Sequence, residues 1–133
     1  MTGADKLAPG LNGVARIRVA DQHTAPHVGS GKIKVLATPV MVNLMEAAAL
    51  QAVEGRLPPG HQTVGTHLNV RHFAATPVGL QVTAEAELIK VEGRTLTFRV
   101  SAADDRGPIG DGEHVRIIVN VASFDKRAQD KLA

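Results

Sequence analysis

The chain has 133 residues, a length that suits a single domain over 1–133 with a core of about 11–124. Its net charge of +2 and its aromatic content of three Phe provide neither a basic surface nor a stacking platform, which argues against nucleic-acid binding. It has no cysteine and no run near the roughly 20 apolar residues of a membrane span, which excludes disulfides, thiolate metal sites and a membrane-spanning helix. No signal-peptide core opens the sequence, so we expect a cytoplasmic protein.

The first half of the chain predicts a strand, a loop and one long helix. Partial alternation of apolar residues predicts a strand over 11–20, and a segment rich in His, Pro and Gly predicts a loop over 21–32. Thr38-Pro39 predicts a helix start, because a threonine oxygen can cap free N–H groups and the fixed φ of proline suits the first turn. The helix is expected to run for about 16 residues. Its core-facing positions at helical spacing are Met41, Leu44, Met45, Ala48 and Ala52.

The second half of the chain predicts four strands. Alternating apolar residues place them over 64–72, 80–88, 96–102 and 113–124. We expect turns at Pro77-Val78-Gly79 and Glu92-Gly93, a further turn region over 104–112, and a charged, frayed tail from Asp125. Within that turn region, Gly110-Asp111-Gly112 is interpreted as a hairpin turn. On the first of the four strands, the side expected to face the core carries Val64, Thr66, Leu68, Val70 and His72.

This order predicts an α+β fold in which one long apolar helix is wrapped by a curved antiparallel sheet. The last strand carries apolar residues on both of its faces. A strand that is apolar on both sides needs cover on both sides, which favours a homodimer formed by strand pairing or helix contact.

Glu46 is the residue of the helix that most needs an explanation. Its neighbours one or two turns away are Val42, Ala49 and Val53, and an ionised carboxylate in such surroundings is costly without a partner. It is therefore expected to be paired, to lie at a subunit boundary or to act in chemistry.

Thr38 and His72 are two further candidates, and each has a structural alternative. Thr38 is either a helix cap or a nucleophile placed where the positive helix end favours an anion or a polarised carbonyl. His72 is either a core residue or a base that shares a proton with Glu46. Thr38 and Glu46 lie about 12 Å apart along a helix at ~1.5 Å per residue, so they cannot readily touch. Either His72 bridges them or a dimer brings one helix end to the other subunit's carboxylate.

No metal or other cofactor is expected. His67 and His72 are five residues apart in a strand and so point to opposite faces, and the sequence has no His-x-x-x-His. Arg116 is a candidate contact for an anionic ligand, and Met41 and Met45 are candidates for the pocket lining.

Several motifs, taken together, resemble the hot-dog-fold thioesterases, most closely their fluoroacetyl-CoA-thioesterase-like branch. They are Val35-Leu-Ala-Thr-Pro-x-Met, Met45-Glu46, Val64-Gly-Thr, Val70-Arg-His-Phe-Ala-Ala-Thr-Pro-x-Gly, Val91-Glu-Gly-Arg, Ile109-Gly110 and His114-x-Arg116. The resemblance implies a homodimer that hydrolyses a short acyl-CoA thioester. It also implies that Thr38, Glu46 and His72 are catalytic and that Gly65-Thr66 lies near the thioester.

The chain departs from this branch in one respect. Fluoroacetyl-specific members carry an aromatic lid near the substrate, whereas residues 21–36 contain no Phe, Tyr or Trp. The sequence therefore favours a general short-chain acyl-CoA thioesterase. The alternatives are a non-catalytic acyl-CoA or metabolite-binding protein of the same fold and, with fold analogy as its only support, a hydratase.

Overall fold

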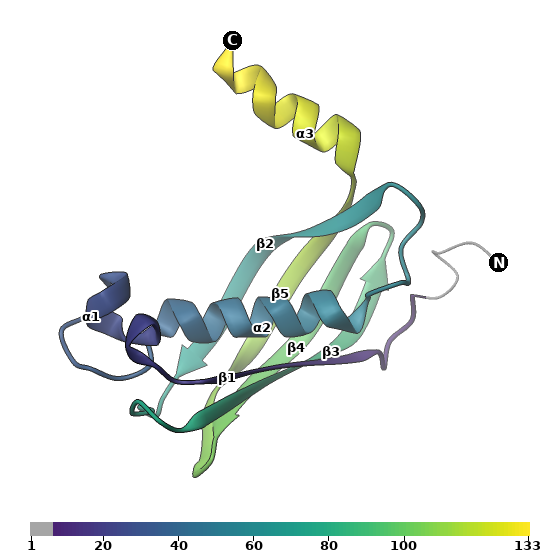
Figure 1. Cartoon of the computed structure of the whole chain (residues 1–133). Coiled ribbons are helices and arrows are strands. Elements are labelled where there is room, and N and C mark those ends of the chain that lie inside the picture. The colour runs from purple at the N-terminus through teal and green to yellow at the C-terminus, as the bar shows by residue number, and fades with distance from the viewer. Residues whose placement is uncertain (1–6) are drawn as a thin grey trace.

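The computed structural model describes residues 7–133, which form one five-stranded sheet and several helices (Figure 1). The strands are β1 (Asn12–Arg18), β2 (His61–His72), β3 (Gln81–Glu92), β4 (Thr95–Asp104) and β5 (Gly107–Asn120). The α-helices are α1 (Ala25–Val28), α2 (Thr38–Ala52) and α3 (Val121–Gln129), and the short 3₁₀ turns are η2 (Asp21–His23) and η3 (Asp130–Leu132).

The sheet is antiparallel throughout and has the strand order β1-β3-β4-β5-β2. It curves around α2, which lies across its concave face (Figure 1). The predicted α+β layout, with one long helix wrapped by an antiparallel sheet, is confirmed. Among the described helices, none combines the length and the apolar content that crossing a membrane requires.

The helix α2 is held by its apolar face. All five predicted core positions are buried, and Ala49 is buried with them. β1 crosses this helix closely at Gly13, where a Cβ would overlap the Ala48 carbonyl oxygen and lie 2.5 Å from the Ala52 nitrogen. Glycine is therefore required at this crossing, because the two backbones leave no room for a side chain.

The predicted facing of β2 is partly wrong, because the strand contains a bulge at Thr66, between Gly65 and His67. Residues directly opposite one another in an antiparallel pair share a face. Leu68 and His72 lie opposite His114 and Gly110, on the face toward α2. Val64 lies opposite Ile117 and so points to the other face, contrary to the prediction. The bulge adds one residue, and everything before it changes sides.

The C-terminal third also differs from the prediction. The expected turn region over 104–112 is confined to a tight turn, and Gly110-Asp111-Gly112 lies within β5 rather than in a hairpin turn. The last strand ends at Asn120 instead of 124, because the Asn120 side chain caps α3 by accepting a hydrogen bond from the Ser123 N–H (3.0 Å). The segment expected to be a frayed tail begins within this helix.

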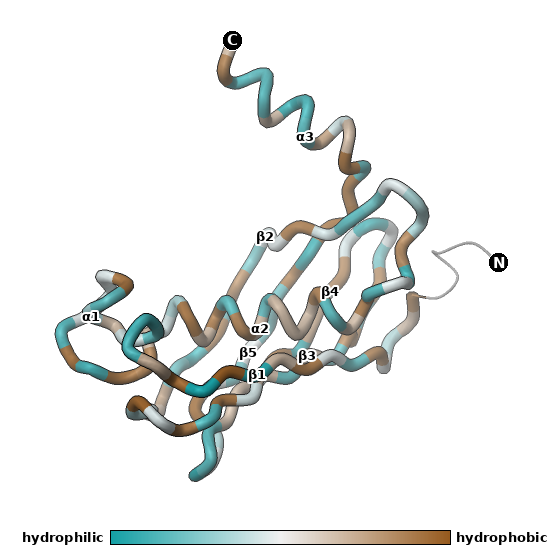
Figure 2. The backbone as a smooth tube through the Cα atoms, in the orientation of Figure 1, coloured by the Kyte–Doolittle hydropathy of each residue, from teal (hydrophilic) through white to brown (hydrophobic). Residues whose placement is uncertain are grey.

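β5 is an interior strand between β4 and β2, so both of its hydrogen-bonding edges are paired within this chain. The sheet edges are β1 and β2. α3 leaves the end of β5 and projects away from the sheet beyond the free edge of β2 (Figure 1). It carries both hydrophobic and hydrophilic residues (Figure 2). The apolar Val121 and Phe124 on it are exposed.

Candidate active site

Thr38 and His72 meet at the N-terminal end of α2. The Thr38 hydroxyl and the His72 Nδ1 form a 2.7 Å hydrogen bond, although the two residues are 34 apart in the sequence. The connection from β2 to β3 makes this possible, because it runs past the start of α2 and the Leu36 N–H donates to the Thr76 carbonyl within it (2.8 Å). A hydroxyl paired with an imidazole is the arrangement in which a base activates a nucleophile.

Thr38 does not act as the helix cap. The N-cap is Ala37, which makes no side-chain cap bond, and Thr38 is the first helical residue. Within residues 7–133, the backbone N–H of Thr38 has no hydrogen-bond partner, whereas those of Val40 and Met41 donate to Ala37. Pro39 has no N–H at all. The first turn of α2 therefore presents a single free donor, beside the Thr38 hydroxyl.

The surroundings of His72 favour its neutral imidazole form. Burial lowers the pKa of His72 below its ordinary value, and the Ala74 backbone opposes only part of that effect. Its second ring nitrogen, Nε2, is buried and has no hydrogen-bond partner among the described residues. A neutral ring whose Nδ1 faces a hydroxyl can accept the proton of that hydroxyl.

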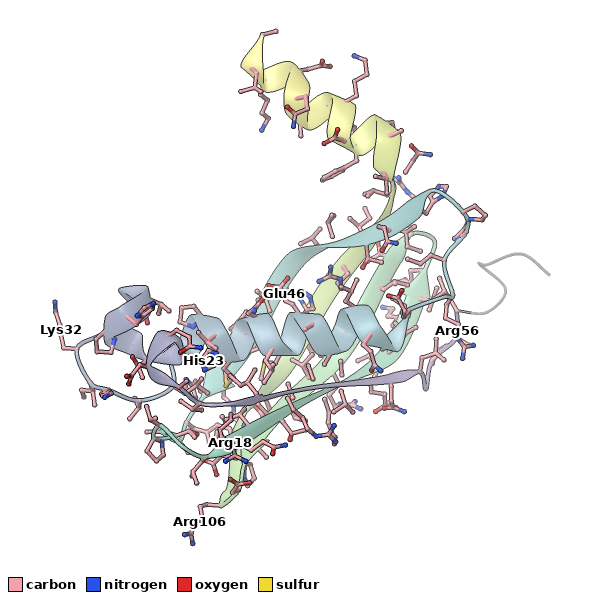
Figure 3. The ribbon with its side chains drawn as sticks, viewed as in Figure 1. Arg18, His23, Lys32, Glu46, Arg56 and Arg106 are labelled. Carbon is pink, nitrogen blue, oxygen red and sulfur yellow. The ribbon has the colours of Figure 1, made fainter. Side chains whose placement is uncertain are left out.

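Glu46 lies in a second polar cluster rather than beside His72. Its side chain is 36 % exposed and points from α2 toward β2 (Figure 3). Its Oε2 accepts a hydrogen bond from Arg116 Nη1 (3.3 Å) and lies 3.9 Å from His114 Nε2. In the described part of the chain, no hydrogen bond or ion pair joins Glu46 to His72. The single chain thus forms two half-sites, Thr38 with His72 and Glu46 with Arg116.

Gly65 lies directly against the Glu46 carboxylate. A Cβ on Gly65 would lie 2.6 Å from Glu46 Oε2 and 3.1 Å from the His114 ring. The neighbouring Thr66 donates its hydroxyl to the Val115 carbonyl (3.2 Å) and is exposed. The absence of a side chain at Gly65 therefore lets the carboxylate lie directly against β2.

An open hollow of about 260 Å³ adjoins the Thr38–His72 pair. Its lining comes from the 25–38 segment and from the start of the β2–β3 connection, and consists of Ala25, Ser30, Val35, Leu36, Thr38, His72, Phe73, Ala74 and Ala75. Met41 and Met45, which the sequence suggested for the pocket lining, are completely buried in the core and do not line this hollow. They support the helix that carries Thr38 and Glu46.

A larger hollow of about 640 Å³ lies on the opposite, convex face of the sheet. It is bordered by charged side chains such as Glu87 and Arg99, which pair with each other at 3.4 Å. It contains neither Thr38 nor His72, so we place the chemistry at the smaller hollow. Within residues 7–133, no three His, Asp or Glu side chains gather in the way that a metal ion requires.

The position of His114 beside Glu46 was not predicted from the sequence. The signal was available, because His114, Arg116 and the core residue Ile118 alternate along one strand and so share a face. The apolar residues on both faces of this strand instead favour, in the sequence alone, a homodimer.

This chain is similar in sequence and in structure to several known proteins. The model of a family described as fluoroacetyl-CoA-specific thioesterase matches residues 19–122. A fluoroacetyl-CoA thioesterase from Streptantibioticus cattleyicolor is 46 % identical over 98 residues, which cover 74 % of this chain and 70 % of that protein.

Solved structures show the same similarity. A structure of a fluoroacetyl-CoA thioesterase is 37 % identical and superimposes with a TM-score of 0.89, covering 94 % of this chain and 97 % of that one. A variant of that thioesterase in complex with acetyl-CoA is 36 % identical, with a TM-score of 0.89 and coverage of 96 % and 100 %. A hot-dog-like protein from Thermanaerovibrio acidaminovorans, 22 % identical, has the same fold, with a TM-score of 0.88 and coverage of 100 % and 98 %.

Proposed function

Since this chain belongs to the fluoroacetyl-CoA-specific thioesterase family and is a thioester hydrolase, we propose that it hydrolyses short-chain acyl-CoA thioesters to the free acid and CoA. The observation that carries the proposal is the 2.7 Å hydrogen bond between the Thr38 hydroxyl and His72 Nδ1, beside an open hollow. The family match and the relative, both described as acting on fluoroacetyl-CoA, favour short acyl groups.

In the proposed mechanism Thr38 is the nucleophile and His72 is the base. His72 Nδ1 takes the hydroxyl proton while the Thr38 oxygen attacks the thioester carbonyl carbon. The free N–H of Thr38 stabilises the negative charge that develops on the carbonyl oxygen. His72 then returns the proton to the departing CoA sulfur, which leaves an ester on Thr38. Water, from which the same imidazole takes a proton, attacks the ester carbonyl; the imidazole returns that proton to the departing Thr38 oxygen, which restores the hydroxyl and releases the acid.

Replacing Thr38 with alanine tests its role. We expect turnover to be lost while the melting temperature stays nearly unchanged, because the Thr38 side chain makes no cap bond. A threonine acting only as a cap would instead cost about 0.5–2 kcal/mol of stability and leave turnover intact. Thr38→Ser is the matched control, since it keeps the hydroxyl. Steady-state kinetics and thermal melting of the three proteins distinguish these results.

The pH dependence of kcat/KM tests the base. Because burial lowers the pKa of His72, the active neutral form should persist to more acidic pH than for a free histidine. We expect kcat/KM to be level at neutral pH and to fall in acid, with a midpoint below the ordinary value of about 6.5. A midpoint above that value would contradict the assignment, because it would require a histidine whose charged form is stabilised.

The separation of the two half-sites supports a site that a second subunit completes. We propose a homodimer in which the free edges of β2 pair antiparallel across a two-fold axis. Such pairing places the start of each β2 near the end of the other, and so brings Glu46 toward the partner subunit's half-site. The carboxylate would there orient the base. The exposed Leu68 on β2 and the exposed apolar residues of α3 support this surface.

Sedimentation tests the assembly. At micromolar concentration we expect about twice the 14.0 kDa chain mass. Leu68→Lys should yield monomers that have lost most activity, because it places a charge on the β2 edge. Val78→Lys is the matched control, since Val78 is 43 % exposed against 41 % for Leu68 but lies in a turn outside β2. A fully active wild-type monomer would contradict the shared site.

The substrate proposal is tested with a panel of acyl-CoA thioesters of increasing chain length, with fluoroacetyl-CoA and aryl-CoA included and the released thiol trapped by a dye. We expect activity to peak among short chains. Acetyl-CoA should be hydrolysed as efficiently as fluoroacetyl-CoA, because residues 21–36 supply no aromatic lid. A peak beyond about eight carbons would contradict the short-chain proposal, since each buried CH₂ contributes about 0.8 kcal/mol only where a pocket receives it. Saturable binding in calorimetry without any thiol release would favour the non-catalytic alternative.

A further inference from the structure

We propose that His114 and Thr63 are positioning residues, which together hold the Arg116 guanidinium in one orientation and thereby fix the carboxylate of Glu46. The inference rests on the proposed thioester hydrolysis, because it concerns how a residue of that site is held. Neither His114 nor Thr63 needs to touch the substrate.

Three residues contact the guanidinium of Arg116. Its Nε donates to the Thr63 hydroxyl (2.9 Å) and its Nη2 donates to the Thr63 carbonyl (3.0 Å). Its Nη1 faces both Glu46 Oε2 (3.3 Å) and His114 Nε2 (3.2 Å). The side chain is only 8 % exposed. A planar guanidinium with this many partners has one orientation available, and that orientation directs Nη1 at the carboxylate.

The bulge in β2 determines the tautomer of His114. The His67 carbonyl, just after the bulge, lies 2.8 Å from His114 Nδ1. A carbonyl oxygen can only accept, so Nδ1 must carry the proton. In a neutral ring, Nε2 is then an acceptor, which suits the Arg116 N–H that faces it. The His67 carbonyl beside the bulge therefore fixes the tautomer of His114, and this tautomer provides the acceptor that orients Arg116.

The surroundings of His114 keep it neutral. Its side chain is completely buried, and its ring stacks against Phe98 with centroids 6.3 Å apart. Burial lowers the pKa of His114, and the Arg116 charge acts in the same direction against the opposing effect of the His67 carbonyl and Glu46. A proton on Nε2 would remove the acceptor and place two cations side by side.

Glu46 depends on this arrangement because the described residues offer its carboxylate few other contacts. Oε2 is bound only from the side of Arg116 and His114, and Gly65, which lies directly against the carboxylate, has no side chain with which to hold it. A shift of Arg116 would therefore let the carboxylate move. Displacements of about 1 Å in a catalytic group can cost up to about 10²-fold in rate.

The Thr63 hydroxyl offers a matched pair of variants. Thr63→Val keeps the shape and removes the acceptor for Arg116 Nε, whereas Thr63→Ser keeps the hydroxyl. We expect Thr63→Val to lower kcat by about tenfold with KM within about twofold, and Thr63→Ser to restore kcat. Val82→Ala is the control for stability alone, since Val82 is fully buried and lies on β3, away from this cluster. It should lower the melting temperature and leave kcat unchanged.

A measurement without substrate tests the same geometry. Nitrogen-15 NMR of the wild-type histidine rings at neutral pH should show His114 protonated at Nδ1 and bare at Nε2. The opposite tautomer, or a charged ring, would overturn the proposal whatever the kinetics. A Thr63→Val protein with wild-type kcat would also overturn the proposal. The same holds if Thr63→Ser and Val82→Ala lower kcat as much as Thr63→Val does.

These results separate the inference from the function that it assumes. A wild-type protein that hydrolyses no acyl-CoA refutes the proposed function, and the NMR result then still decides the tautomer of His114. An active wild-type enzyme that is indifferent to Thr63→Val refutes only the positioning role.

Discussion

His72→Ala should lower kcat/KM by about 10²–10⁴-fold, the range that a positioned general base contributes. The alanine removes the only ring that bonds to the Thr38 hydroxyl in the described structure. Glu46→Gln, which keeps the shape and removes the charge, should also lose most activity. If both residues act in one step, the double variant should be little worse than His72→Ala, because residues that act as a unit are not additive.

The control for this experiment is Arg99→Ala. Arg99 borders the hollow on the convex face of the sheet and pairs with Glu87 at 3.4 Å. It should retain wild-type kinetics. Small, fully additive losses for His72→Ala and Glu46→Gln would identify both residues as structural and would remove the basis of the proposed mechanism.

Gly13→Ala should be among the most destabilising single substitutions in the chain. The added methyl would overlap the Ala48 carbonyl oxygen, so β1 and α2 would have to separate. Overpacking of a rigid contact costs about 1–3 kcal/mol and occasionally more, and backbone on both sides leaves little room to relax. Chemical denaturation of the purified variant measures the loss of unfolding free energy.

Gly31→Ala serves as the comparison. Gly31 also has no positive φ, but its added methyl would meet only the Ala25 side chain, at 3.2 Å. We expect a change within about 0.5 kcal/mol, as for surface positions in general. Equal losses for the two alanine variants would show that the close crossing of β1 and α2 does not limit stability.

The fold was predictable because its strongest signals are periodic and local. The apolar positions of α2, from Met41 to Ala52, recur at helical spacing, and β3 and β4 alternate with a clear Glu92-Gly93 turn between them. These patterns require burial on one side, and the structure buries them. The predicted helix α2 and the predicted β3–β4 hairpin are therefore both confirmed.

The errors arose where a single residue overrides a pattern. One extra residue at Thr66 reverses the facing of everything before it in β2, and no periodicity reveals a bulge in advance. Asn120 ends a strand and caps a helix although the apolar run continues through Val121. Gly110 and Gly112 resembled a turn but serve a close approach within the sheet, where a Cβ on Gly112 would lie 2.6 Å from the Val70 Cα.

The candidate site was predictable residue by residue but not as an arrangement. Thr38, Glu46 and His72 stand out by residue type and by their surroundings in the sequence. Which of them touch depends on contacts between residues far apart in the chain, such as the 70-residue separation between Glu46 and Arg116. Helix geometry alone did indicate that Thr38 and Glu46 could not meet within one helix.

The position of β2 at the sheet edge has a consequence for the order of folding. β2 follows α2 in the chain, yet its strand partner is β5, so His72 lies opposite Gly110 and His61 opposite Asn120. β3, β4 and β5 follow one another in the chain and pair as neighbours, whereas β2 pairs with a strand that lies about forty residues later in the sequence. Closing such long loops is slow relative to hairpin formation. During synthesis on the ribosome, a chain that has not yet released β5 lacks the strand that pairs with β2, and we therefore expect the contact between His72 and Thr38 to be among the last to form.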